Sequence, residues 1–447
     1  MLNRTAEAVD FALTHGMLQY SPDGKLRHAP LCTSPYHISY DNFHFMVQNS
    51  LTLQSLTQII SMDKELLIDL HAPLQQHDPF IATLLDIARS SLSNESPWRF
   101  HLSRSDFMLD NKTSTPKFVE INTIAASFHG LAQMVAQLQN NLARRNLINT
   151  KAEENPVLSH LVAALERAVN AINYENPCLL MVVQPDERNV FDQRLLQYAV
   201  QEQLNMPFWR MSLDEVAQRA KRKGDTLYIE NQPVAMVYLR SGYGPNDYDT
   251  PDAVAGRILI EQCHCLRVPD IFTQLAGTKL TQHYMCSNAA MKQYLSPEQV
   301  DLLAPSIAPM YRLDDMSGNK SMRDIACLTP ECYVLKPQRE GGGHNLYYDD
   351  IPPFLENLPL EQYSLYVLMD KINAITHPAE LVVNQHSQNI EAISEIGWYG
   401  AALYHDSQCY FNQNLGYLVR TKSVDSNEGG VCSGYACLNA ISVDKPQ

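Results

Sequence analysis

The sequence predicts a mixed α/β fold, in which a small parallel α/β unit, roughly residues 178–278, is inserted into a larger framework. The first observation is the order of segments in that unit. A buried-type apolar strand at 178–184 precedes a helical run at 191–204 and a second strand at 234–241, an order typical of parallel strands. The second observation is that strand-like segments after residue 330 follow one another across short turns, which indicates a mostly antiparallel sheet.

The length and charge of the chain bound its organisation. Its 447 residues exceed one simple hydrophobic core, since domains of ~100–200 residues are usual. We divide the chain into an N-terminal framework part (1–177), the inserted unit (178–278) and a C-terminal framework part (279–447). The net charge of -15 argues against a nucleic acid or an anionic membrane as partner, because either would require a basic surface.

Targeting signals and cysteine usage predict a cytoplasmic protein. No stretch approaches the ~18 consecutive apolar residues of a membrane span, and the N-terminus lacks the regions of a signal peptide. The ten cysteines are scattered, and none of them form the paired CxxC motifs of a zinc site. We therefore expect free thiols in a reducing compartment rather than a zinc site.

Two helices are predicted before the inserted unit. The first lies in residues 1–18, where amphipathic spacing places on one side Ala8, Phe11, Ala12 and Leu18. The second follows Asn155 and Pro156, which we expect to be its N-cap and its first residue. Its apolar face is formed by Leu158, Leu161, Val162, Leu165 and Val169.

The C-terminal part is predicted to contain four strands, at 333–336, 365–372, 390–404 and 409–422. The HDSQ segment between the last two predicts a β-hairpin. We expect the strands to share one mostly antiparallel sheet, with a glycine-rich loop between two of them.

The segment KFVEINT, residues 117–123, is a candidate metal site. Side chains alternate along a strand, so Glu120 and Asn122 face one side while Val119 and Ile121 face the other. A carboxylate and an amide oxygen are hard ligands suited to Mg²⁺. Two interpretations stay open at this point: a Mg²⁺ site, or an amphipathic strand with its polar face in water.

The segment VLKPQREGGGHNLYY, residues 334–348, combines cations, a carboxylate and three glycines. Uncrowded backbone N–H groups can bind phosphate oxygens, Lys336 offers a point charge, and Glu340 could hold a metal that bridges the phosphates. A flexible surface turn is the alternative. The chain has no GxxxxGK[ST] P-loop, and GYGPND, residues 242–247, does not complete a dinucleotide-binding GxGxxG.

Further cations suggest anion binding. Arg420 and Lys422 share a strand face, and Arg104 and Arg240 are candidates for bidentate carboxylate binding. A solvated strand face and structural ion pairs are the alternatives. A second glycine-rich segment, NEGGVCSGYACL at 427–438, reads either as a mobile lid or as a plain turn.

Taken together, these segments resemble the eukaryotic-type glutathione synthetase family. The resemblance covers about Arg104 to Cys437 in family order, through FVEINTIAASFHGLA, ERNVFDQR, VYLRSGY, QLAGTK, VLKPQREGGGHNLY, ISEIGWYG, LVRTK and EGGV. It implies an ATP-grasp fold with a glycine-rich lid and an inserted substrate domain. It also implies an ATP-dependent ligase that joins γ-glutamylcysteine to glycine through an acyl phosphate, and a homodimer.

The resemblance implies site residues in four groups. Mg²⁺ would be held by Glu120, Asn122 and Glu340, and the catalytic residues would be Arg104, Lys336 and Arg420. ATP would be contacted by Lys279, Lys336, Glu340, Gly341, Gly342, Gly343, His344, Asn345, Tyr347, Met369, Asp370, Lys371, Ile372, Glu395, Lys422 and Glu428. The peptide would be contacted by Arg104, Ala125, Ala126, Ser127, Glu187, Asn189, Gln193, Arg240, Tyr243, Arg420, Val431 and Cys432.

The chain departs from the family pattern at several positions. Serine is common where Ala125 stands, glycine where His129 stands and asparagine where His344 stands. Residues 431–434 read VCSG, whereas members that use glycine carry a VAAG-like sequence there. The acceptor is therefore expected to be glycine, with β-alanine, serine or alanine as alternatives.

Two other functions remain to be weighed. A regulatory nucleotide-binding protein without catalysis should have lost metal ligands or phosphate-binding cations, yet all of these residue types are present. A phosphotransferase that stops at a phosphorylated product would turn over without any requirement for an amine.

Overall fold

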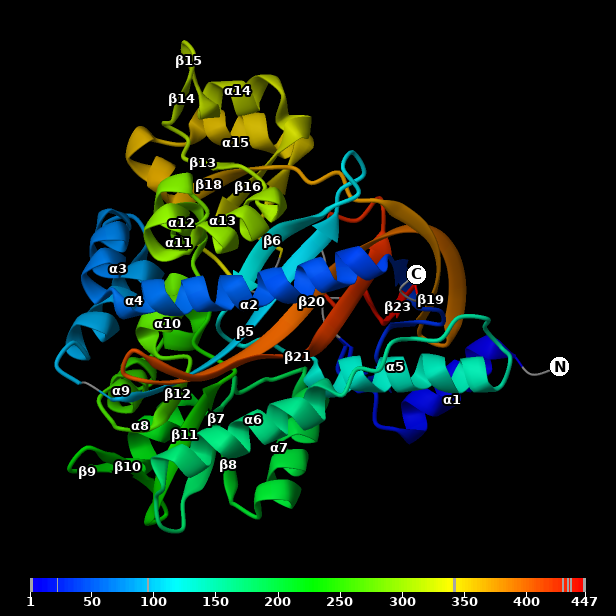
Figure 1. The fold of residues 1–447 in the computed structure, drawn as a ribbon. Helices are drawn as coiled ribbons and strands as arrows, with labels where there is room; N and C mark the ends of the chain where they lie inside the picture. Colours follow the sequence, from blue (N-terminus) through cyan, green and yellow to red (C-terminus); the bar gives the residue numbers. More distant parts are fainter. Residues whose placement is uncertain are drawn as a thin grey trace.

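A seven-stranded sheet forms the centre of the computed structural model, which describes residues 3–21, 23–94, 96–340, 343–427, 430–431, 434 and 436–444 (Figure 1). Its neighbours pair antiparallel except for β22 and β3, which pair parallel. Its order is β19 (Thr376–Val383), β3 (Leu31–Cys32), β22 (Cys437–Asn439), β21 (Gln408–Ser423), β20 (His386–His405), β5 (Trp98–Leu109) and β6 (Pro116–Asn122).

The predicted inserted unit forms a separate six-stranded sheet. Four of its strands are parallel and confirm the prediction: β8 (Phe208–Met211), β7 (Cys178–Val182), β11 (Gln232–Leu239) and β12 (Leu266–Val268). Two antiparallel strands extend it, β10 (Thr226–Ile229) and β9 (Lys221–Lys223). It packs with α6 (Val157–Ile172), α7 (Val190–Leu204), α8 (Leu213–Arg219), η2 (Pro245–Tyr248) and α9 (Pro251–Glu261).

Alternation along β7 links this sheet to two cores. Leu179 and Met181 face the large central core, whereas Cys178, Leu180 and Val182 face a second, smaller core. All five side chains are buried, which explains why the segment reads as a continuous apolar run.

The strands predicted at 333–336 and 365–372 do not join the large sheet, so the prediction of one antiparallel sheet was wrong. They belong to a four-stranded sheet in the order β13 (Met310–Tyr311), β18 (Tyr366–Asp370), β16 (Tyr333–Pro337) and β17 (Leu346–Tyr347). The physical reason is a third core, in which Leu335 and Leu368 pack with Leu355. This core includes α14 (Met322–Leu328) and α15 (Ile351–Asn357), next to the hairpin of β14 (Met316–Ser317) and β15 (Lys320–Ser321).

Helices complete the framework. The long helix α2 (Tyr40–Met62) crosses the strands β5, β20 and β21 (Figure 1). The others are α1 (Arg4–Thr14), α3 (Lys64–His71), α4 (Pro79–Ser90), α5 (His129–Arg144), α10 (Ile271–Ala276), α11 (Lys279–Met285), α12 (Asn288–Tyr294) and α13 (Pro297–Leu303). Two small sheets pair β1 (Leu18–Tyr20) with β2 (Leu26–His28), and β4 (Tyr36–Ile38) with β23 (Ile441–Val443). Short 3₁₀ helices are η1 (Ala72–Leu74), η3 (Ala304–Ser306), η4 (Pro330–Cys332), η5 (Tyr348–Asp350) and η6 (Leu360–Leu365).

Two predicted helix boundaries were wrong. Helix α1 ends at Thr14, and Leu18 opens β1, because Gly16 adopts a positive φ of 74° that turns the chain. The N-cap of α6 is Pro156 rather than Asn155. The side chain of Asn155 instead bonds the backbone of Tyr417, accepting from its N–H at 3.0 Å and donating to its carbonyl at 2.7 Å.

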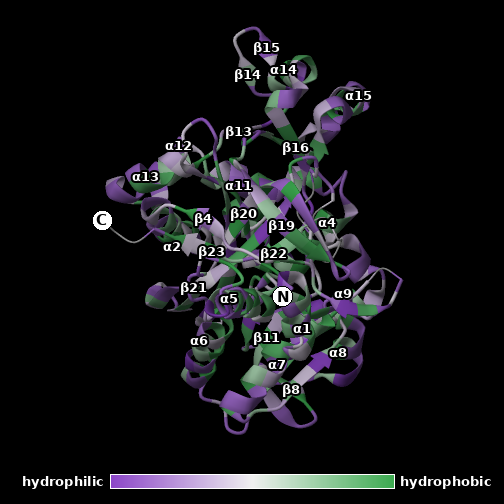
Figure 2. Cartoon of the chain, turned by 90° about the vertical axis from the view of Figure 1, so that its right-hand side faces the viewer, coloured by the Kyte–Doolittle hydropathy of each residue, from purple (hydrophilic) through white to green (hydrophobic). Residues whose placement is uncertain are grey.

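Hydropathy follows the layers. Figure 2 shows hydrophobic residues gathered on strands inside the molecule and hydrophilic positions on many outer helices. Within the described residues, no helix combines the length and the apolar character needed to span a membrane.

Candidate active site

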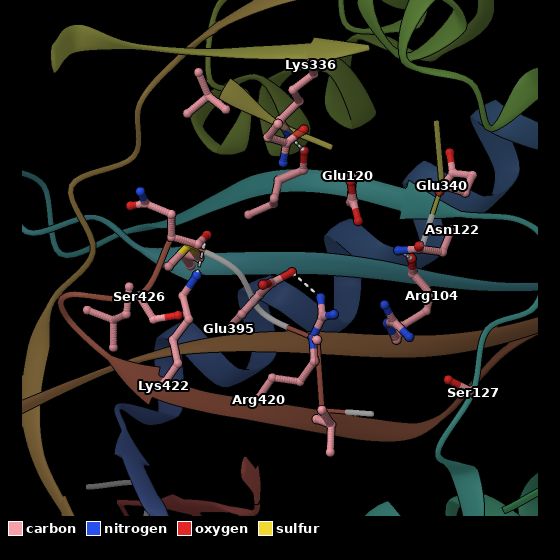
Figure 3. A pocket seen from close by; sticks show the side chains of 18 of the residues that line it. Arg104, Glu120, Asn122, Ser127, Lys336, Glu340, Glu395, Arg420, Lys422 and Ser426 are labelled. Atoms are coloured by element: carbon pink, nitrogen blue, oxygen red, sulfur yellow. Dashed lines mark hydrogen bonds and ion pairs between the residues drawn. The ribbon is translucent and has the colours of Figure 1, made fainter. Parts of the chain in front are cut away.

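A cavity of about 590 Å³ lies where the three sheets meet. Strands β5, β6, β20 and β21 of the large sheet line it, together with β16 and β18 of the four-stranded sheet. Residues that follow β6, β7, β11, β18 and β21 supply further parts of the wall. Figure 3 shows that Lys336 reaches the cavity from the four-stranded sheet, while Arg104, Glu395, Arg420 and Lys422 reach it from the large sheet.

Strand β6 delivers Glu120 and Asn122 to the cavity, and the prediction of a strand here is confirmed. Ile121 between them is fully buried in the core. β6 is an edge strand, and the side chain of Gln282 pairs with it as a neighbouring strand would. The Gln282 carboxamide accepts from the Ile121 N–H at 3.1 Å and donates to the Ile121 carbonyl at 3.3 Å.

Lys279 joins the two carboxylates that the sequence proposes as metal ligands. Its ammonium lies 3.2 Å from Glu120 and 3.0 Å from Glu340, although the two glutamates are far apart in the sequence. Burial alone would lower the pKa of Lys279, but the carboxylates outweigh it and raise the pKa above its ordinary value. The two glutamates thus already hold one positive charge between them.

The pKa values of the two glutamates move in opposite directions. Burial would raise the pKa of Glu120, but nearby cations, led by Lys279, hold it well below its usual range. Burial is the largest influence on Glu340 and raises its pKa in spite of the Lys279 contact. Environments that separate the pKa values of neighbouring acids are common at functional sites.

Lys336 is a buried cation on β16, on the side of the cavity formed by the four-stranded sheet (Figure 3). Its ammonium donates to the Val119 carbonyl at 3.1 Å, on the free edge of β6. Burial lowers its pKa, and Glu120 partly offsets that effect.

A cluster of two arginines and two acids lies on the large sheet. Arg104 donates to both oxygens of Asp106, from Nε at 2.6 Å and from Nη2 at 2.8 Å. Arg420 donates from Nη2 to Asp106 at 3.1 Å and to Glu395 at 2.5 Å. Burial raises the pKa of Glu395 even though Arg420 opposes the shift. Asp106 itself does not line the cavity.

The turn after β6 is fixed by two tyrosines. Tyr238 donates to the Ala126 carbonyl at 3.1 Å, and the hydroxyl of Tyr399 donates to the Ser127 carbonyl. Ala125 has a φ of 53°, which is uncommon for alanine, and it lines the cavity together with Ala126 and Ser127. His129, at the start of α5, packs against the Tyr399 ring, with the ring centroids 4.2 Å apart and the ring planes tilted by 34°.

The loop before α7 forms the far end of the cavity. Glu187 accepts from the Asn189 N–H at 2.7 Å and from the Gln193 side chain. The Arg240 guanidinium lies 3.6 Å from Asp192, whose carboxylate also accepts from the Phe128 N–H at 2.8 Å. Burial raises the pKa of Asp192, although Arg240 opposes the shift.

The cavity brings together most of the residues that the sequence singled out. Those that line it are Arg104, Glu120, Asn122, Ala125, Ala126, Ser127, Glu187, Asn189, Arg240, Tyr243, Lys336, Glu340, Asn345, Tyr347, Met369, Asp370, Lys371, Ile372, Glu395, Arg420, Lys422 and Val431. The predicted residues Lys279, Gln193, Gly343 and His344 are not among those that line it, although Lys279 contacts the lining residues Glu120 and Glu340. Gly341, Gly342, Glu428 and Cys432 lie outside the described residues.

Sequence reasoning missed several residues. Asp106 and Asp192 are buried partners of Arg104 and Arg240, and Tyr348, which lines the cavity, accepts from the predicted Lys371 at 3.0 Å. Asp106 could have been found, because it stands two residues after Arg104 on the same strand face. The sequence carries no comparable signal for Asp192, whose partner is a distant strand residue.

A cavity lined by lysines, arginines and carboxylates, from two sheets and from the loops of the inserted unit, is typical of an enzyme that acts on anionic substrates. The model of one family, described as "Eukaryotic glutathione synthase, ATP binding domain", matches residues 3–443. The chain belongs to this family.

Relatives of known name cover nearly the whole chain. Glutathione synthetase, chloroplastic, of Arabidopsis thaliana is 32% identical, over 97% of this chain and 84% of its own length. The human glutathione synthetase is 31% identical, over 97% of this chain and 95% of its own. A solved structure of a glutathione synthetase-like effector from Globodera pallida, in its apo form, shares the fold with a TM-score of 0.78 and 17% identity. That match covers 99% of this chain and 96% of the effector.

Proposed function

We propose that the chain is an ATP- and Mg²⁺-dependent ligase that forms glutathione from γ-glutamylcysteine and glycine. The observation that carries the proposal is the meeting of Lys279 with Glu120 and Glu340, at 3.2 and 3.0 Å, beside the buried Lys336. Two cations and two carboxylates in one site suit the binding of a nucleoside triphosphate with its metal. Membership of the glutathione synthase family supplies the reaction type.

The architecture we propose is the ATP-grasp fold. The nucleotide would lie between the four-stranded sheet and the large sheet, under the glycine-rich loop that follows β16. The chain would divide into framework parts at 1–177 and 279–447 around a substrate-binding unit at 178–278. The loop around 338–345 and the segment at 424–436 would act as lids that exclude water.

The nucleotide would be held by lysines and by the end of β18. Lys336 and Lys279 would contact phosphate oxygens, and Met369–Ile372 would border the base. The donor set of Glu120, Asn122 and Glu340 fits Mg²⁺, because both carboxylates already contact a cation and Asn122 adds an amide oxygen. When bound, Mg²⁺ would supply charge neutralisation at the phosphate that is transferred.

The reaction would proceed in two steps. The cysteinyl carboxylate of the dipeptide would attack the γ-phosphorus of ATP, so that ADP leaves and an acyl phosphate forms. The amine of glycine would then attack the acyl carbon, phosphate would leave, and the nitrogen would lose a proton. Arg104 and Arg420 would orient the reacting carboxylate by charge-assisted hydrogen bonds.

The glutamyl end of the dipeptide would occupy the far end of the cavity. Arg240 would bind its carboxylate, Glu187 its ammonium group, and the turn at 125–127 would supply backbone contacts. We further propose a cytoplasmic homodimer, as the family resemblance implies.

The test is ADP release by the purified chain with ATP, Mg²⁺ and γ-glutamylcysteine, with and without glycine. We expect strong glycine-dependent release together with a product of the mass of glutathione. Little release with glycine but strong release with β-alanine, serine or alanine would reassign the acceptor. ATP binding without turnover on any acceptor would overturn the proposal in favour of a regulatory nucleotide-binding protein. Release that needs no amine would favour a phosphotransferase.

A further inference from the structure

Asp106 is a carboxylate next to the cavity that accepts four hydrogen bonds, all of them from side chains that line it. It is fully buried and accepts from Arg104 at 2.6 and 2.8 Å and from Arg420 at 3.1 Å. It also accepts from the side-chain nitrogen of Asn122, at 2.9 Å. One buried acid therefore touches both arginines on the sheet and one proposed metal ligand.

The strand registers make this convergence possible. On β5, Arg104 and Asp106 share a face, and they pair with Asn122 and Glu120 across β6. On the other side, Asp106 lies opposite Gly397 of β20. A Cβ at Gly397 would stand 2.5 Å from the Asp106 carboxylate and 2.6 Å from Cδ of Arg104, so this position must stay without a side chain.

Hydrogen-bond chemistry fixes the orientation of Asn122. An ionised carboxylate only accepts hydrogen bonds, so Asn122 must turn its NH₂ group toward Asp106. The amide oxygen of Asn122 then remains available to a cation in the cavity, which Asn122 lines. Changing a carboxylate that orients a metal ligand in this way typically costs about 10- to 100-fold in metal affinity.

We propose that Asp106 is a positioning residue of this site. It fixes the orientation of the Arg104 and Arg420 guanidinium groups, which would bind the substrate carboxylate, and it turns the amide oxygen of Asn122 toward the metal position. Asp106 does not line the cavity, so it does not touch substrate and acts only through its partners. The inference rests on the proposed function, because it takes the dipeptide and a divalent cation as the ligands.

The test compares Asp106→Asn with Ser105→Ala in the full chain. Ser105 is equally buried on the same strand but faces the other side, so it controls for disturbance of β5. In Asp106→Asn, an NH₂ group replaces one acceptor oxygen and faces the arginines. Direct binding of γ-glutamylcysteine, measured by calorimetry, and of Mn²⁺, measured by electron paramagnetic resonance, should each weaken about 10- to 100-fold. Ser105→Ala should bind both as the wild type does.

A second variant keeps the proposal testable if Asp106→Asn does not fold. Gly397→Ala leaves every charge in place but displaces the Arg104–Asp106 pair, so it should weaken dipeptide binding about 10-fold. A folded Asp106→Asn protein that binds both ligands as the wild type does would overturn the inference and leave the proposed function intact. Weakening of one ligand alone would also overturn it, since the inference requires both. A wild-type chain that binds neither ligand would overturn the proposed function, and the inference with it.

Discussion

The two ends of the cavity differ in how far their polar atoms are already partnered. At the large-sheet end, Arg104 and Arg420 on the sheet and Lys279 at the start of α11 each contact one or two carboxylates. At the far end, buried polar atoms lack hydrogen-bond partners among the described residues, namely Arg240 Nε, Asn189 Oδ1, Asp192 Oδ1, Gln193 Oε1 and both ring nitrogens of His129.

This difference assigns different tasks to the two ends. Buried polar atoms without partners cost about 1–3 kcal/mol each, so folding alone does not favour the far end. Of these residues, Arg240 and Asn189 line the cavity, so a polar ligand bound there could supply partners to them. The large-sheet end is already neutralised internally, and its geometry is set before any ligand arrives. We call the large-sheet end the paired end. We therefore expect mutations at the paired end to lower stability as well as function, and mutations at the far end to lower affinity with little loss of stability.

The largest effect is expected from removing an arginine of the paired end. Arg104→Met would leave the fully buried Asp106 with two fewer hydrogen bonds. Breaking a buried ion pair in this way should lower the free energy of unfolding by about 3–5 kcal/mol, measured by urea titration without ligands. Arg188→Met, an exposed position on the cavity rim, is the matched control and should stay within about 0.5 kcal/mol. Equal stability of the two variants would contradict the comparison.

Glu340→Gln should separate turnover from peptide binding. It keeps the shape of the side chain but removes the charge that contacts Lys279 at 3.0 Å and that would hold the metal. We expect kcat to fall at least about 100-fold, with the dipeptide KM changed less than about threefold. Steady-state kinetics at saturating Mg²⁺ would measure both. An unchanged kcat would remove Glu340 from the proposed mechanism.

The stability of the protein should depend on pH through His71, which is buried behind the paired end. Its ring is fully buried and bonds the Leu67 carbonyl and the Thr278 hydroxyl, each at 2.7 Å, next to Lys279. Burial lowers the pKa of His71 to about 4, so the folded state binds fewer protons than the unfolded state between about pH 6.5 and 4. The stability it contributes is present above pH 6.5 and is lost as the pH falls through this window.

From pH 7.5 to 5.0, this residue should account for about 2 kcal/mol of lost unfolding free energy. His71→Gln, which keeps a polar side chain but does not titrate, should lose that much less over the same range. Identical pH dependence of the variant and the wild type would show that His71 is not the source.

Arg240→Lys should give the smallest effect and the clearest contrast. The cation near Asp192 is kept, so the free energy of unfolding should change by less than about 1 kcal/mol. The planar donor fork is lost, so the dipeptide KM should rise about 10-fold while the ATP KM stays constant. If Arg240→Lys lowered the free energy of unfolding and left the dipeptide KM unchanged, the task assigned to the far end would be wrong.

Local patterns predicted much of the fold and part of the site. The alternation at Glu120 and Asn122 gave the right strand, and the apolar runs gave the right parallel unit. These signals are local, because they depend only on neighbouring residues and on how regularly apolar residues recur along the sequence. Gathering the motifs into one site, in contrast, depended on the family resemblance.

Long-range pairing set the limits of prediction. The local pattern of a strand does not indicate which sheet the strand joins. Leu335 and Leu368 pack in a separate core, so their strands belong to the four-stranded sheet and not to the large sheet. Asn155 looks like an N-cap from its neighbours alone, but it bonds the backbone of Tyr417, 262 residues further along the chain. The contact of Lys279 with Glu340 likewise joins residues whose proximity no sequence period expresses.

The pairing of Gln282 with β6 also bears on how the chain avoids self-association. An open strand edge offers unpaired N–H and carbonyl groups on which a second chain can add a strand. Here the edge of a seven-stranded sheet is closed at Ile121 by one carboxamide and at Val119 by the Lys336 ammonium. Gln282 and Lys336 therefore occupy backbone groups of β6 that would otherwise be available to pair with a strand of a second chain.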